Sequence, residues 1–251
     1  MKTILSVLVL AGTASVAMAD DHVGVSGSPQ TVNGYTINGE YHTNGGVGAR
    51  NVIAYDNRAG GLFTSGIRPA FVMDDVSFTP GPAAGGGQFL TGINFGFSVN
   101  GPASFDAQIY FFDTLTGAAS PVNTGLFGAF SVGFGSVANG SYQSGLIDIT
   151  SLSIFAPDDN LGVVFRFVQA GTNTLATNVT SLFAGGGATV GSSQDVYWRD
   201  ADGNGQFDSG DARFFNGAPN LANVYMQLEV PAPASLALLG LGGIVAGRRR
   251  R

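Results

Sequence analysis

Apolar residues alternate with small or polar residues along much of the chain. In the segment LTGINFGFSV (residues 90–99), every second residue from Ile93 to Val99 is apolar. This period of two is typical of a strand with one buried face. The segments AQIYFFD (107–113) and GVVFRFV (162–168) are more densely apolar. They predict strands in the interior of a sheet, and we expect the first of them to be covered on both faces.

Other short segments of this kind recur between turns rich in glycine, asparagine and aspartate. Short apolar segments separated by such turns indicate strands instead of helices. They are Asn51–Tyr55, Ala70–Met73, Asp74–Phe78, Leu126–Phe134, Ser144–Ile149, Ile154–Phe155, Ser193–Trp198 and Asn223–Val230. Roughly ten strands at this spacing predict an all-β fold, an antiparallel β-sandwich of jelly-roll type. A β-helix is the alternative, but no repeat of fixed period supports it.

The composition agrees with this fold class. The chain has 39 Gly and 19 Phe among 251 residues, and glycine disfavours helix interiors while phenylalanine provides large apolar surfaces. It has no cysteine, so the fold cannot depend on disulfides.

The first nineteen residues have the pattern of a secretory signal peptide. Lys2 is followed by the apolar run Ile4–Ala11 and by the small-residue site Ala17-Met18-Ala19. A charged start, a short apolar run and a small-x-small site predict cleavage by signal peptidase after Ala19 and export of the chain. We therefore expect a mature body over residues 20–229.

The last residues, VPAPASLALLGLGGIVAGRRRR (230–251), predict a membrane-inserted tail. The 16 residues of 232–247 carry no charge. As a helix they would be roughly 24 Å long, somewhat short for a hydrocarbon core of about 30 Å. The positive charges that follow favour a cytoplasmic C-terminus, and they disfavour a helix buried in the body. They are Arg248, Arg249, Arg250 and Arg251.

This order of residues resembles a PEP-CTERM sorting signal. The match lies in Val230, Pro231, Ala232 and Pro233, followed by the apolar segment and the terminal arginines. The family usually has Glu where this chain has Ala232. The resemblance implies recognition by an exosortase, a membrane-embedded cysteine protease-transpeptidase of bacteria that make exopolysaccharide. It also implies that the tail is removed or exchanged near Pro231–Pro233, and that the protein is held in the membrane only until then.

The body resembles the β-sandwich ectodomains that often precede such tails. There, an Asp-Asp-x-x-Phe strand precedes a glycine-rich break and a Leu-Thr-Gly-Ile-x-Phe strand, as residues 74–78 and 90–95 do here. The implied location is the cell envelope, the outer surface or the extracellular matrix.

Charge limits the partners of the mature protein. Without the signal peptide and the terminal arginines, 6 basic residues remain against 17 acidic ones, a net charge of about −11. Such a surface repels nucleic acid, and it repels anionic polysaccharide unless divalent cations bridge the two.

The segment DADGNGQFDSGD (200–211) predicts a calcium site. Its spacing matches the D-x-[DN]-x-[DN]-G loop, in which alternate side chains converge on one point while a glycine turns the chain. Hard oxygen donors suit Ca²⁺, and the segment has no His or Cys for zinc or copper. With Asp in place of Glu at position 12, the loop resembles the dockerin or EF-hand-like variety, here between two strands, with Phe207 as an apolar plug. The predicted ligands are Asp200, Asp202, Asn204, Gln206, Asp208 and Asp211.

Catalytic motifs are weak, so we expect a non-enzymatic protein with a structural or adhesive role, stabilised by Ca²⁺. The two histidines, His22 and His42, lie near no nucleophile motif. A carbohydrate-binding module of the envelope or exopolysaccharide is the first alternative. Exposed aromatics such as Tyr197 and Trp198 would provide a platform for it, but the sequence favours core packing for each of them. A secreted hydrolase is the second alternative.

Overall fold

The structure is a computed structural model, and it describes residues 18–20, 23–43, 51–64, 71–78, 87–113, 124–200, 202–204, 207, 210–215 and 223–232. In these residues the regular structure consists of β-strands and one short 3-10 turn, η1 (Thr150–Leu152). The predicted all-β class is therefore confirmed. None of the helical structure in these residues is long and apolar enough to cross a membrane. The predicted membrane segment lies outside the described residues except for Ala232.

The first sheet is built around β11 (Ala103–Asp113). It pairs antiparallel with β12 (Thr124–Val137) on one side and with β16 (Asn160–Gln169) on the other. The full order is β1-β19-β18-β8-β16-β11-β12-β4-β5. The remaining strands of this sheet are β1 (Met18–Asp20), β4 (Gly34–Ile37), β5 (Glu40–Thr43), β8 (Val72–Ser77), β18 (Tyr197–Arg199) and β19 (Ala212–Phe215).

The second sheet is built around β10 (Gly92–Val99). Antiparallel to β10 lie β13, β14, β17 and β21 (Met226–Pro231), and β21 pairs in turn with β6 (Asn51–Asp56). The other strands of this sheet are β2 (Val23–Val25), β3 (Gln30–Thr31), β7 (Leu62–Thr64), β13 (Gly140–Gln143), β14 (Ile147–Asp148), β17 (Val179–Ala184) and β20 (Asn223–Val224). A separate pair consists of β9 (Gln88–Phe89) and β15 (Phe155–Ala156).

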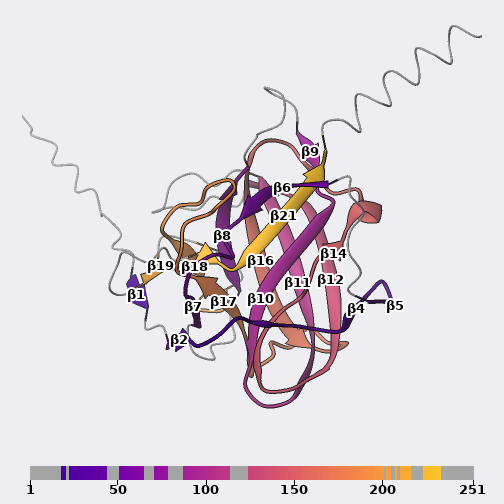
Figure 1. The fold of residues 1–251 in the computed structure, drawn as a ribbon, viewed down its shortest axis with the longest axis vertical. Coiled ribbons are helices and arrows are strands. Elements are labelled where there is room, and N and C mark those ends of the chain that lie inside the picture. Colours follow the sequence, from indigo (N-terminus) through magenta and orange to yellow (C-terminus); the bar gives the residue numbers. More distant parts are fainter. Residues whose placement is uncertain are drawn as a thin grey trace, which may run out of the picture.

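The two large sheets face each other across a core of phenylalanines. Figure 1 shows β10 and β21 crossing in front of β11, β12 and β16. Between these layers, the ring centroids of Phe97 and Phe105 lie 5.1 Å apart, and those of Phe95 and Phe165 lie 5.2 Å apart. Phe134 of β12 contacts both β10 rings. All five rings are buried, so the alternating pattern found in the sequence is the inner face of the fold.

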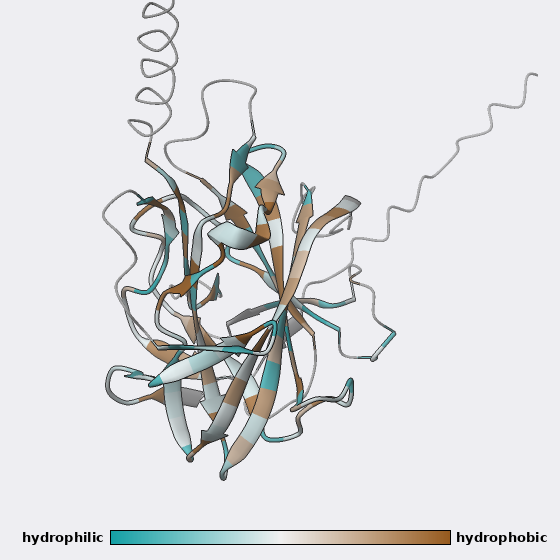
Figure 2. Cartoon of the chain, turned by 90° about the vertical axis from the view of Figure 1, so that its right-hand side faces the viewer, coloured by the Kyte–Doolittle hydropathy of each residue, from teal (hydrophilic) through white to brown (hydrophobic). Residues whose placement is uncertain are grey.

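The strand interiors follow the predicted alternation, with one difference. Along β11, buried Phe105, Ala107, Ile109 and Phe111 alternate with residues that are at least partly exposed, and Figure 2 shows such apolar and polar bands along the strands. The strand is central within its sheet, as predicted, but its outer face is only half covered. The prediction of two covered faces was therefore wrong. The segment is densely apolar because the aromatic residues Tyr110 and Phe112 lie on the outer face, where they are only half-buried.

Several strands escaped prediction because their sequences break the apolar pattern. In β17 the polar residues Thr180 and Ser181 are buried beside Leu182 and Phe183. The segments predicted as Ala70–Met73 and Asp74–Phe78 form the single strand β8, in which two aspartates lie in the middle. Most of the short N-terminal strands also lack a clear period.

The predicted signal peptide is described only at its end. Met18–Asp20 form β1, which pairs parallel with β19, with Ala19 opposite Phe214. Cleavage after Ala19 stays a prediction, and it would remove two of the three residues of this strand.

Candidate metal centre and sorting segment

Two antiparallel strands hold the ends of the predicted calcium loop. Tyr197 and Trp198 of β18 pair with Arg213 and Ala212 of β19, so residues 200–211 connect two neighbouring strands. The placement between two strands is confirmed, but the strand that follows the loop is β19, whereas the sequence predicted Asn223–Val230. The N–H of Arg199 donates to the carbonyl of Asp211 at 2.9 Å. The N–H of Asp200 donates to the carbonyl of Phe71 at 3.1 Å. The first and last aspartates of the loop are therefore fixed by the sheet.

Three of the predicted ligands come together. One carboxylate oxygen from each of Asp200, Asp202 and Asp211 lies within 4.8 Å of the other two. Asp200 and Asp211 are buried, whereas Asp202 is exposed. Gln206 and Asp208 lie outside the described residues.

Asn204 also contacts these carboxylates, but through donors. Its backbone N–H donates to Oδ1 of Asp200 and to Oδ1 of Asp202, each at 3.1 Å. Its side-chain Nδ2 donates to Oδ2 of Asp202 at 2.9 Å. The Asn204 amide therefore turns its nitrogen toward Asp202, whereas a ligand role requires its oxygen. Gly203 has a φ of +73°, which a glycine adopts without strain.

Phe207 anchors the loop in the body. It is 8% exposed and packs in a cluster with Met73, Val164, Val196, Trp198 and Ala212. The prediction of an apolar plug is confirmed. Because Trp198 is the only tryptophan of the chain, its fluorescence reports on this loop.

The sorting residues begin inside the sheet. Val230 is buried in β21, and Pro231 and Ala232 are half-buried. The motif and the β body therefore share a strand. Pro233 and the four terminal arginines lie outside the described residues.

A carboxyl group of β8 is buried, which the sequence pattern did not predict. Asp74 is fully buried, and its Oδ2 accepts the N–H of Val224 at 2.6 Å. Its Oδ1 has no hydrogen-bond partner among the described residues. Burial raises the pKa of Asp74 well above its ordinary value, and the neighbouring charge of Asp75 raises it further. Burial also raises the pKa of Asp75, whose carboxylate accepts the N–H of Gln194.

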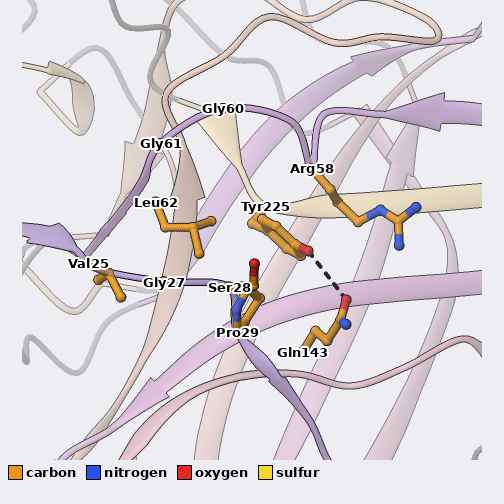
Figure 3. A pocket seen from close by; sticks show the side chains of 10 residues that line it. All are labelled: Val25, Gly27, Ser28, Pro29, Arg58, Gly60, Gly61, Leu62, Gln143 and Tyr225. Atoms are coloured by element: carbon orange, nitrogen blue, oxygen red, sulfur yellow. Dashed lines mark hydrogen bonds between the residues drawn. The ribbon is translucent and has the colours of Figure 1, made fainter.

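A pocket of about 600 Å³ lies on the second sheet (Figure 3). Val25 and Leu62 form its apolar side, and the side chains of Arg58, Tyr225 and Gln143 gather on the other. The Tyr225 hydroxyl donates to Oε1 of Gln143 at 3.3 Å. No sequence motif pointed to this pocket, because its lining comes from four separate segments of the chain.

A salt bridge fixes the cation of this pocket. Arg58 donates from Nε to Oδ1 of Asp56 and from Nη2 to Oδ2, both at 2.9 Å. Burial alone would raise the pKa of Asp56, but the side-chain and backbone hydrogen bonds from Arg58 outweigh it and lower that pKa.

The remaining predicted chemistry is placed as follows. His42 of β5 stacks on Tyr35, with ring centroids 5.4 Å apart, and His22 lies outside the described residues. Tyr197 and Trp198 are fully buried next to the loop, which confirms the favoured expectation of core packing and excludes them as an exposed sugar platform.

The fold and the loop thus define an all-β protein with a cluster of carboxylates in a β-hairpin connection. The PEP-CTERM protein-sorting motif matches residues 229–251. This motif implies an exported cell-surface protein with a C-terminal anchor that is processed by an exosortase. No curated protein and no solved structure matches the chain.

We expect Asp74 to make folding stability depend on pH. Because its folded-state pKa lies above that of the unfolded chain, Asp74 stabilises the fold at low pH. That stability is lost as the pH rises from the ordinary aspartate value through the raised pKa, and Asp75 acts in the same direction.

The variant Asp74→Asn keeps an acceptor for the Val224 N–H but cannot ionise. It should flatten the dependence of Tm on pH and raise Tm by a few degrees at neutral pH, measured by thermal denaturation from pH 4 to pH 8. Glu40→Gln, at an exposed position, is the control. An unchanged pH profile in Asp74→Asn would contradict this role.

Proposed function

We propose that this protein is a non-enzymatic component of the bacterial cell surface or extracellular matrix with a structural or adhesive role. It is exported by its signal peptide and sorted by its tail, and its body is a jelly-roll β-sandwich stabilised by Ca²⁺. The observation that carries this proposal is the sorting motif at residues 229–251, which begins within β21, a strand paired with β10 on one side and β6 on the other. His42, the histidine that the structure describes, packs on a ring, which supports a structural role for it.

The carboxylate cluster supports the calcium part of the proposal. Three carboxylates with oxygens within 4.8 Å repel one another. A divalent cation of the hard type removes that repulsion and suits an all-oxygen donor set. Asp200, Asp202 and Asp211 would hold it, together with the oxygens of Gln206 and Asp208 that the loop pattern provides. Asn204 would have to turn its amide oxygen toward the ion to join them.

The expected affinity is modest, because extracellular calcium modules bind at about 10⁻⁴ to 10⁻³ M. The ion would link β18 to β19 and seat Phe207 beside Trp198. Its role in this proposal is to stabilise the fold, with no part in a reaction.

We expect Ca²⁺ to raise the Tm of the purified chain. At ten times the dissociation constant, binding adds about 1.4 kcal/mol of stability, or a few degrees in Tm. Trp198 fluorescence should change over the same range of concentration. Asp211→Asn should weaken binding at least about tenfold, because it removes a buried anionic ligand.

Asp148→Asn, which removes an exposed carboxylate outside the cluster, should respond to Ca²⁺ like the unaltered chain. If Tm and fluorescence do not respond to Ca²⁺, or if Asp148→Asn reduces the response as much as Asp211→Asn, the calcium proposal fails.

The tail is testable in a host that has an exosortase. A chain that ends at Ala232 should fold and be exported but should not be attached to the surface. It should appear in the medium instead, measured by fractionation and immunoblotting. Surface attachment of the shortened chain equal to that of the full chain would refute sorting by residues 233–251.

A carbohydrate-binding module is the second candidate, and the pocket of Figure 3 favours it. Its volume of about 600 Å³ is in the range of ligand sites. The planar polar groups of Arg58, Gln143 and Tyr225 suit hydroxyl groups, which both donate and accept hydrogen bonds. Because the mature chain is acidic and Asp56 pairs with Arg58, we expect an uncharged glycan.

In affinity electrophoresis, an uncharged polysaccharide should retard the chain, and Tyr225→Phe should reduce that retardation several-fold because the hydroxyl lies in the pocket. Tyr110→Phe on β11 is the matched control. Equal retardation of both variants, or none of the unaltered chain, would reject this candidate.

A further inference from the structure

The end of β21 overlaps the sorting motif, and its pairing changes along those residues. At Glu229 the strand is held on both sides, since Glu229 lies opposite Gly92 of β10 and Ile53 of β6. Its carbonyl accepts the N–H of Thr91 at 2.9 Å. The first residue of the matched motif is therefore in the interior of the sheet.

The next two residues are still paired, but on one side. Val230 lies opposite Val52 and Pro231 opposite Asn51, both on β6. The described register with β10 stops at Glu229. Val230 is only 3% exposed and belongs to the main hydrophobic core. Removing it would take an apolar side chain out of that core.

A protease binds its substrate as an extended segment whose backbone groups pair with the enzyme. Residues paired within a sheet must first leave it, at a free-energy cost that depends on the local stability. For Val230 and Pro231 this requires separation from β6 and exposure of Val230. Half-buried Ala232 is the last described residue and lies beyond the described pairing.

We propose that the folded body sets the processing position: the exosortase cuts on the C-terminal side of Ala232, and the mature chain keeps β21 intact through Pro231. This inference rests on the proposed exosortase processing. The step breaks one backbone C–N bond. The acyl carbon passes to the cysteine thiol of the enzyme and then to water or an acceptor amine, and the released nitrogen takes up a proton.

The direct test is C-terminal peptide mapping, with intact mass, of the full chain recovered from the surface of a host that has an exosortase. The expected mature chain ends at Ala232 or a few residues later. Chains that end at Pro231 or earlier would overturn the inference while leaving processing itself established. Recovery of Arg251 at the end of all surface chains would instead overturn the processing on which the inference depends.

A disulfide clamp tests the same point independently, because the chain has no cysteine. Val52→Cys with Val230→Cys joins two residues that lie opposite each other in the pairing of β6 with β21. Because Val230 belongs to the sorting motif, the reference is the single variant Val230→Cys. With the bond verified by mass, the clamped chain should be processed to the same end and to the same extent as that single variant.

The control clamp is Gln108→Cys with Ser131→Cys, which joins opposite residues of β11 and β12 in the other large sheet. The contrary result is that the Val52–Val230 clamp blocks processing, whereas the control clamp and the single-cysteine variants are still processed. It would show that β21 must leave β6. That result would overturn the inference.

Discussion

Burial of phenylalanine side chains between the two large sheets is the interaction on which the rest of the structure depends. The chain has no disulfide to stabilise it outside the cell, so apolar burial must offset the entropy lost on folding. Phe95 and Phe97 of β10 provide the centre of this layer, because their rings contact strands of the facing sheet. Every other feature is attached to strands that this layer holds in place.

The predicted calcium loop and the sorting segment illustrate this attachment. The loop begins and ends on β18 and β19, and β18 pairs with β8 of the first sheet. The sorting motif begins on β21, which pairs with β10. A loop with a cluster of carboxylates and a processing signal are thus positioned by the same core, at different places in the fold.

The sequence predicted those parts of the fold in which alternation follows burial. It located β10, β11, β16 and β21 because their apolar residues face the core. It failed for β17, where buried Thr180 and Ser181 look like a polar turn, and it divided β8 at Asp74 and Asp75. Sequence patterns assume that polar residues are exposed, and these strands bury them.

The candidate sites also differ in how far the sequence could predict them. The loop could be predicted because its ligands are close in sequence, and three of the carboxylates do converge. The orientation of the Asn204 amide could not, because it depends on local hydrogen bonds. The pocket at Arg58 and Tyr225 could not either, because strand pairing brings its residues together from distant segments.

One cooperative β body, built on the phenylalanine layer, extends through Val230 and therefore includes the start of the sorting motif. Hydrogen exchange measured by mass spectrometry on the full chain tests this directly. We expect amides of β21 through Val230 to exchange as slowly as those of β10 and β11. Exchange at Leu228–Val230 as fast as in an unfolded peptide, while β11 stays protected, would contradict it.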